Sequence, residues 1–111
     1  MDSENPTPFE LAILQVFYDE YHALGFPSPD VVKVSARKNT GVGRYVSLVT
    51  NAKLTCDDNY LDMGGKFIEM EGVSNGLMAI ISVVNSTLDE LEIATYGNNS
   101  WNGDERCWKI I

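Results

Sequence analysis

Hydrophobic residues recur every three or four positions near the start of the chain, as on one side of an α-helix. The members of this apolar stripe are Phe9, Ile13, Val16, Phe17, Tyr21 and Leu24. The stretch TPFE at residues 7–10 is a capping box, in which Thr7 accepts from the amide of Glu10 and Glu10 reaches back to the amide of Thr7. Gly25, with prolines at 27 and 29, ends the pattern. We therefore predict one helix over about residues 8–24.

After residue 30 the hydrophobic period shortens towards two, and β-branched and aromatic residues become common. The segments with this character are VVKVSAR, RYVSLVTNAKL, KFIEMEG, LMAIISVV, LDELEIATY and RCWKII, and those between them have turn chemistry. LMAIISVV is apolar at nearly every position and predicts a central strand covered on both faces, one of them by the helix. We predict one α+β domain, with the N-terminal helix packed on an antiparallel β-meander of about five to six strands over about residues 31–111.

The chain has 111 residues, the size of a single domain, and 16 Asp and Glu against 8 Lys and Arg give a net charge of −8. Such a charge either keeps the protein in solution and does no more, or attracts a basic protein, and it repels nucleic acid and anionic membranes. The N-terminal stretch MDSENPTPFE has no signal-peptide character, and no apolar run reaches the length of a membrane span. We expect a reducing cytoplasmic location with Cys56 and Cys107 as free thiols, unless the fold brings the two close enough to pair.

The stretch RKNTGVGRY at residues 37–45 contains the glycine pair that most resembles a phosphate-binding loop. No Lys-Ser or Lys-Thr follows the glycines, the third glycine of a dinucleotide fingerprint is missing, and the next residues have strand character. We predict instead a turn between the first two strands, in which Gly41 and Gly43 serve the backbone. Two arginines bracket this turn and either pair inside the protein or contact a partner; they are Arg37 and Arg44, with Glu69 or Glu71 as internal partners.

The sequence predicts no catalytic set and no cofactor site. His22 is the single histidine, and a structural or exposed role is expected for it. With one histidine and no CxxC motif, the chain lacks the ligand types of a zinc site at workable spacing. Carboxylates occur in groups at 57–58, 69–71 and 89–92, and three interpretations stay open: a solvated sheet face, a docking surface for a basic protein, or a hydrolase or metal site.

Aromatic residues near the C-terminus lie among Asn, Gly, Asp and Glu. Such neighbours are more typical of a protein-binding hot spot than of a nucleic-acid platform, which needs basic neighbours. We expect Tyr96 and Trp101, the latter in the loop NNSWNG, to lie at the surface. Trp108, in WKII, is expected in the core.

Three motifs along about residues 8–102 resemble those of a widespread group of small bacterial proteins. They are RKNTGVGRYV, FIEMEGVSNGLMAII and LDELEIATYGNNSW, with Arg44 and Tyr45 where the group usually has two phenylalanines. The group has no established enzymatic activity, so the resemblance implies a fold and a bacterial origin. Small acidic helix-and-sheet proteins of this kind are also similar to immunity proteins, which neutralise toxins such as those of contact-dependent growth inhibition.

We therefore predict an immunity protein that binds a basic toxin, such as a nuclease, and occludes its active site or substrate surface. No catalytic residue, metal or cofactor is assigned to the chain. The predicted contact residues are Asp57, Asp58, Asp62, Asp89, Glu90, Glu92, Tyr96 and Trp101. Two alternatives remain: a small carboxylate-dependent hydrolase or metal-binding protein, and a structural or regulatory subunit that pairs with a second copy through a sheet edge.

Overall fold

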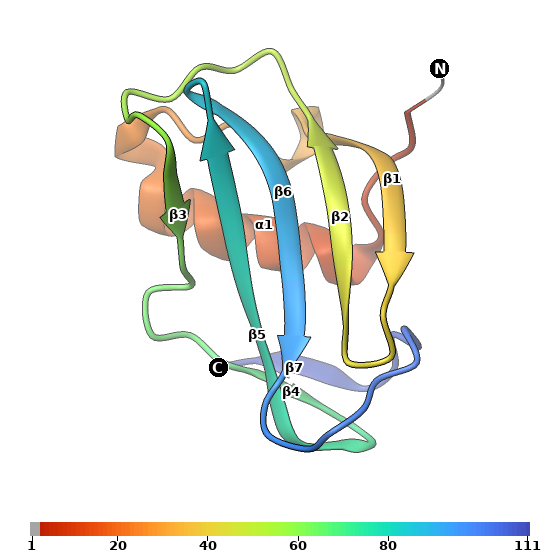
Figure 1. Ribbon diagram of the computed structural model, residues 1–111. Helices are drawn as coiled ribbons and strands as arrows, with labels where there is room; N and C mark the ends of the chain where they lie inside the picture. Colours follow the sequence, from red (N-terminus) through yellow and green to blue (C-terminus); the bar gives the residue numbers. More distant parts are fainter. Residues whose placement is uncertain (1–2) are drawn as a thin grey trace.

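The computed structural model describes residues 3–111 and shows a helix packed against one face of a seven-stranded antiparallel sheet (Figure 1). The helix is α1 (Pro8–Tyr21). The strands are β1 (Lys33–Asn39), β2 (Gly43–Val49), β3 (Asn59–Leu61), β4 (Ile68–Met70), β5 (Val73–Val84), β6 (Thr87–Thr95) and β7 (Trp108–Ile110). This architecture confirms the predicted α+β class, with slightly more strands than the five to six expected.

The helix begins and ends where local residues require it. Thr7 Oγ1 accepts from the Glu10 amide at 3.1 Å, and Glu10 Oε1 accepts from the Thr7 amide at 2.9 Å, so both halves of the predicted capping box are present. A 3₁₀ turn, His22–Leu24, continues the helix to Gly25, whose φ of 90° lets the chain turn away. The predicted helix is therefore confirmed.

The strands lie in the order β1-β2-β6-β5-β4-β7, with β3 beside β5. This order departs from a simple meander, because β6 inserts between β2 and β5. The second edge of the 12-residue strand β5 is shared by two short strands: Leu61 of β3 faces Ile81, and Ile68 of β4 faces Leu77. The additional strand, β3, lies within CDDNYLDMGG, a segment whose Asp and Gly content predicts a turn. Its three residues are too few for an alternating pattern to be recognised in the sequence.

Strand β5 is buried on one face only, so the prediction that both faces are covered is wrong. Leu77, Ala79 and Ile81 face the helix and are at most 1% exposed. Met78 and Ile80, which alternate with them, are only half-buried. In the described part of the chain α1 is the one α-helix, and it lies behind the sheet in the view of Figure 1. The other face of the sheet is therefore left without a covering layer.

The core lies between α1 and the helix-facing side of the sheet. Phe9, Ile13 and Phe17 of α1 are fully buried, in one cluster with Leu91 and Ile93 of β6. A core on one side of the sheet forces alternate residues of the central strands to point the other way. The side chains that they carry there decide what the uncovered face can bind.

The TGVG turn joins β1 to β2, as predicted. Gly41 has a φ of 89°, which favours glycine. A side chain at Gly43 would come within 2.2 Å of the backbone oxygen of Ile93 in β6. The carbonyl of Gly41 accepts from the amide of Trp101 at 2.8 Å. The turn therefore serves as a docking point for the C-terminal loop.

Candidate partner-binding face of the sheet

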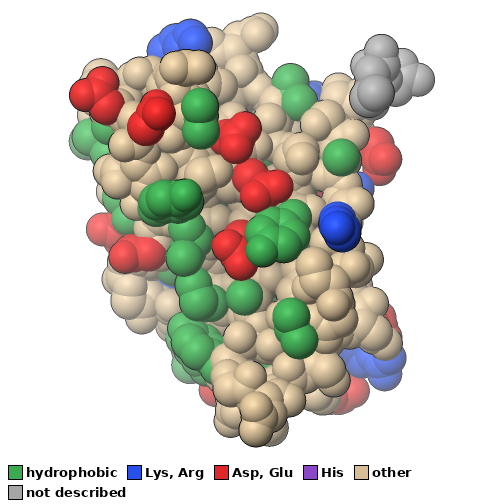
Figure 2. Space-filling model, in the orientation of Figure 1, with side chains coloured by type: hydrophobic (Ala, Val, Ile, Leu, Met, Phe, Trp, Pro, Cys, Tyr) green, Lys and Arg blue, Asp and Glu red, His purple; other side chains and the backbone are tan. Residues whose placement is uncertain are grey.

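The face of the sheet that α1 leaves uncovered, which we call the open face, presents outward side chains of the three central strands (Figure 2). They are Tyr45, Ser47 and Val49 of β2, Glu90, Glu92 and Ala94 of β6, and Met78, Ile80, Ser82 and Val84 of β5. Figure 2 shows acidic and hydrophobic side chains interleaved over these strands. On the β1 side, Lys38 lies opposite Tyr45 in the strand register. The open face therefore combines apolar area with negative charge.

An acidic row runs along β6 and consists of Asp89, Glu90 and Glu92. In the cross-strand register, Glu92 lies between Tyr45 of β2 and Ile80 of β5. A bulge in the pairing of β5 with β6 lets Asp89 approach the same side, with its carboxylate 3.5 Å from the hydroxyl of Ser82. Of the three carboxylates, Glu92 therefore lies between an aromatic and an aliphatic side chain, and Glu90 and Asp89 lie beside Ser82.

The acidic row raises the pKa of groups among its own members and neighbours. The pKa of Glu90 lies above its usual value because the side chain is partly buried, and because Asp89 and Glu92 add negative charge. The pKa of the Tyr45 phenol is also raised, first by the charge of Glu92 and then by burial. In both cases neighbouring anions disfavour the ionised form. A cation placed at the row would therefore be stabilised.

The three predicted aspartates outside the acidic row lie near β5 but also serve the fold. Asp62 follows β3, on the side of β5 opposite β6, and accepts from the Tyr21 hydroxyl at 3.3 Å and the Gly64 amide at 2.8 Å. Asp58 accepts from the Asn85 amide at 2.8 Å, which ties residues 57–58 to the turn between β5 and β6. Asp57 precedes it and is exposed. The structure thus places Asp62 beside the edge of β5, near Met78, and the other two beside one end of β5.

Tyr96 is 41% exposed and stacks on Phe67, a residue that the sequence analysis did not single out. The two ring centroids are 5.9 Å apart, with 24° between the ring planes. The Phe67 ring fits against the backbone of Gly76 in β5, where an added Cβ would lie 2.2 Å from its Cζ. The two rings, with Met78, line a cavity of about 290 Å³ that we call the Phe67 cavity. Only the fold could reveal this pairing, because 29 positions separate the two rings in the sequence.

Trp101 is 4% exposed, so the prediction that it lies at the surface is wrong. Its loop folds back onto the TGVG turn, where its amide donates to the Gly41 carbonyl. Its Nε1 donates to the Asp104 carbonyl at 2.9 Å, and its ring meets Phe9 edge-on with centroids 5.9 Å apart. Trp108, expected in the core, is half-buried and packs on the core with its ring centroid 5.4 Å from that of Phe9.

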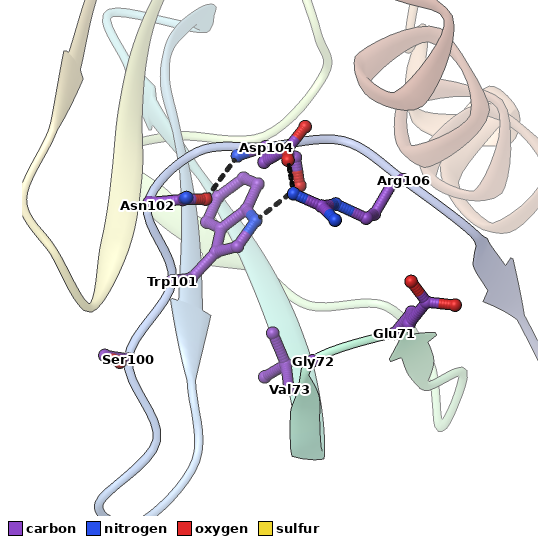
Figure 3. Close-up of a pocket in the computed structure, with 8 residues that line it drawn as sticks. All are labelled: Glu71, Gly72, Val73, Ser100, Trp101, Asn102, Asp104 and Arg106. Carbon is purple, nitrogen blue, oxygen red and sulfur yellow. Dashed lines mark hydrogen bonds and ion pairs between the residues drawn. The ribbon is translucent and has the colours of Figure 1, made fainter.

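Trp101 also forms a wall of a polar cavity of about 330 Å³ between the β4–β5 turn and the C-terminal loop (Figure 3). Arg106 forms an ion pair with Asp104 there, and Glu71 lies across from them. None of the acidic-row carboxylates lines this cavity. Trp101 is therefore part of a separate region and not of the open face.

The two arginines that bracket the TGVG turn meet at a buried glutamate. Glu10 is 0% exposed and accepts from Arg37 Nε at 2.8 Å, Arg37 Nη2 at 2.7 Å and Arg44 Nη1 at 3.0 Å. Arg44 also forms an ion pair with Glu105 and donates to the Gly103 carbonyl at 2.8 Å. We call Glu10, Arg37, Arg44 and Glu105 the ion cluster. It joins α1, the β1–β2 hairpin and the C-terminal loop.

Both arginines pair inside the protein, which was one of the two alternatives, but the expected partners Glu69 and Glu71 are wrong. The capping box assigns Glu10 a local role only, yet the same carboxylate has oxygen lone pairs left to accept from guanidinium groups. Burial opposes its ionisation, but the Arg37 hydrogen bonds, the Thr7 amide and the two positive charges outweigh burial and hold its pKa below the usual value. The sequence signal was present, as a glutamate on the apolar side of the helix.

The structure therefore divides the charges of the chain into two groups. All three arginines form internal ion pairs, with Glu4, Glu10, Asp104 and Glu105 as partners. Within residues 3–111 no ion pair involves a carboxylate of the acidic row or Asp57, Asp58 or Asp62. The carboxylates of the open face are consequently not engaged in ion pairs within residues 3–111.

The remaining candidate residues form no site of their own. His22 is exposed, and its Nδ1 lies 3.2 Å from the Tyr18 carbonyl. Cys56 and Cys107 are free thiols, as predicted. In residues 3–111 no group of three or more His, Cys, Asp or Glu side chains is arranged to bind a metal ion. No helix in that range is long and apolar enough to cross a membrane.

Comparison of the chain with protein-family models, curated proteins and solved structures finds no match in any of the three. The function is therefore inferred from the geometry and charge of the open face.

Proposed function

We propose that the protein is an immunity protein, which binds a basic bacterial toxin through the open face and thereby blocks the toxin's active site or substrate surface. The observation that carries this proposal is the acidic row, whose carboxylates form no ion pair in residues 3–111 and of which Glu92 lies between Tyr45 and Ile80. Half-exposed apolar side chains supply the area of a complex, and the carboxylates supply its charge.

Electrostatics favour a basic partner of the nuclease class. A nuclease needs a positive surface to hold phosphates, and this surface attracts an acidic protein and speeds its association. The chain carries a net charge of −8, and its described arginines all form internal pairs with carboxylates outside the acidic row. Occlusion requires no chemistry by this chain, and it places the protein in the cytoplasm of the cell that it protects.

The size of the molecule suits a complex of ordinary dimensions. Its principal extents are 37 × 33 × 21 Å, so its broad side is about 37 Å by 33 Å. A stable complex commonly buries about 800 Å² on each partner. The broad side that includes the open face is large enough for this.

Charge reversal on the open face tests the proposal. The variant Glu90→Lys/Glu92→Lys should fail to protect cells that express the toxin encoded next to this gene, and should fail to co-purify with it. A matched control, Asp19→Lys/Asp30→Lys, makes the same change in net charge at exposed positions outside the sheet and should protect fully. Protection by both variants would reject the open face as the binding surface. A failure of the unchanged protein to bind the neighbouring toxin would reject the immunity function.

A carboxylate-dependent hydrolase is the second candidate, because the pKa of Glu90 is raised beside Asp89 and Glu92. The open face does not enclose these groups, and a binding role fits an uncovered surface better. A hydrolase would lose turnover in the variant Glu90→Gln while its partner binding persisted. Pairing of two copies through a sheet edge, as a structural subunit would require, is tested by measuring the mass in solution with light scattering.

A further inference from the structure

The Phe67 cavity opens where β5 lacks a strand neighbour on one edge. β3 ends at Leu61, opposite Ile81, and β4 begins at Ile68, opposite Leu77. The loop between these two strands passes the intervening part of β5 without pairing to it. A cavity of about 290 Å³ remains between this loop and Met78.

The apolar walls of this cavity are held in place by the backbone. The amide and carbonyl of Phe67 each pair with Ile111 at 2.8 Å. Its ring rests against Gly76 on one side and stacks on Tyr96 on the other. Any side chain at position 76 would collide with the Phe67 ring and push it out of this position. The cavity is therefore a formed feature of the fold.

The cavity lies near the acidic row on the open face. Met78 pairs with Ala94, and Ile80, the next outward residue of β5, pairs with Glu92. Met78 and Glu92 are therefore diagonal neighbours on adjacent strands, a spacing of about 7–8 Å. Asp62 and Lys66 form the polar part of its rim.

We propose that the Phe67 cavity is the anchor site for one large apolar side chain of the partner, such as Leu, Met or Phe, while a neighbouring Lys or Arg of the partner binds the acidic row. This assignment rests on the function proposed above. Binding energy in interfaces concentrates on a few buried anchors within pockets, and charged groups around them set specificity. A volume of about 290 Å³ is at the lower limit of small-molecule pockets, which favours a single side chain as the occupant.

Two short peptides test the anchor site directly. The probes are acetyl-Lys-Lys-Leu-Lys-Lys-amide and its glycine counterpart acetyl-Lys-Lys-Gly-Lys-Lys-amide, titrated into the ¹⁵N-labelled full chain and followed by NMR. The leucine peptide should bind about fivefold tighter, since a partly buried leucine adds a fraction of the transfer energy of its side chain. Its additional shifts should concentrate at Phe67, Met78 and Tyr96. Both peptides should shift Glu90 and Glu92.

Substitutions on β5 locate the preference for leucine. Met78→Ser should reduce the leucine advantage to less than about twofold, because it removes an apolar wall of the cavity. Val84→Ser is the matched control: Val84 is 42% exposed, points outward from the same strand and does not line the cavity. This variant should keep the full advantage. The circular dichroism of each variant checks that the fold is intact.

Equal binding of the two peptides by the unchanged protein would overturn the anchor site, and so would equal loss of the preference in both serine variants. The cell-protection assay described above distinguishes a failure of the anchor site from a failure of the proposed function. A preserved leucine preference without protection would reject the immunity function alone. Protection without any leucine preference would reject the anchor site alone.

Discussion

The ion cluster and the acidic row hold carboxylates in opposite ways. In the ion cluster, Glu10 is completely buried, and both of its carboxylate oxygens accept from guanidinium groups. In the acidic row, Glu90 and Glu92 are half-buried, and the ion pairs of residues 3–111 do not include them. A buried carboxylate requires partners, whereas one beside solvent keeps much of its hydration without them. The first arrangement maintains the fold, and the second is available to a partner.

Arg37 and Arg44 form ion pairs in the ion cluster and, within residues 3–111, none with the acidic row. Arg44 joins Glu10 to Glu105, and its guanidinium carbon lies 4.9 Å from the centroid of the Trp101 ring, within reach of a cation–π interaction. Arg37 uses its donors on Glu4 and Glu10. In the described part of the chain, the ion pairs of these cations are therefore with carboxylates of the helix side and the C-terminal loop, and not with those of the acidic row.

The largest expected effect is the loss of the central carboxylate of the ion cluster. Glu10→Ala should lower the free energy of unfolding by about 3–5 kcal/mol, because it leaves Arg44 buried with part of its charge uncompensated and removes half of the capping box. Urea denaturation measures this change. The matched control is Glu4→Ala, which removes a carboxylate that is 74% exposed from the same Arg37 and should cost less than about 1 kcal/mol. Equal costs for the two variants would contradict the central role of Glu10.

A smaller effect is an opposite pH dependence of stability in the two regions. Folding lowers the pKa of Glu10, so its contribution is complete above the unfolded value of about 4.5 and is lost as the pH falls through the folded pKa. Folding raises the pKa of Glu90, so its contribution is complete below about 4.5 and is lost as the pH rises through the folded pKa. Urea unfolding of the wild-type protein, Glu10→Gln and Glu90→Gln at several pH values measures both.

The expected curves follow from these signs. The wild-type protein should gain stability over Glu10→Gln as the pH rises through the acidic range. Glu90→Gln should be the more stable protein near neutral pH, by less than about 1 kcal/mol, because it removes repulsion within the acidic row. The stability difference between the wild-type protein and each variant is plotted against pH. Slopes of the same sign for Glu10→Gln and Glu90→Gln would contradict the opposite pH dependence of the two regions.

The smallest effect concerns a single phenol at the edge of the acidic row. The pKa of Tyr45 should lie above the usual tyrosine value of 10.0, mainly because of the charge of Glu92. Glu92→Gln should bring it back towards that value, and added salt should do so partly in the wild-type protein. NMR titration of the tyrosine ring signals reports both shifts. The control variant is Glu4→Gln, which changes a carboxylate that is 74% exposed and lies outside the acidic row, and which should leave the titration of Tyr45 unchanged.

The features that the sequence predicted correctly depend on neighbouring residues. The capping box TPFE and the stop at Gly25 define the helix through contacts within one turn of the chain. The TGVG turn follows from the conformations that glycine permits. Strand propensity located six of the seven strands and missed β3, whose three residues pair with β5 through the tertiary fold.

The candidate site was predicted in part. The sequence identified Glu90 and Glu92 as residues on one face of a strand, because the period of two places alternate residues together. The sequence could not reveal that this face lies open. The neighbouring strand β5 contains LMAIISVV, which is apolar enough for a strand that is covered on both faces. The sequence also placed Trp101 at the surface, because the loop NNSWNG is polar throughout and the ring is buried by Phe9 and Arg44, which are distant in sequence.

By itself the sequence determined the helix, the turn chemistry, the alternating strands and the excess of acid, because each depends on the types and spacing of residues close together in the chain. Only the tertiary structure decided which charged residues pair with one another. Glu10 and Arg44 are 34 positions apart, and Arg44 and Glu105 are 61 apart. Long-range pairs of this kind form when packing brings elements together, and α1 is able to cover only one side of the sheet. With α1 on one side, Arg44 is buried with its partners, and the acidic row lies on the side of the sheet that α1 leaves uncovered.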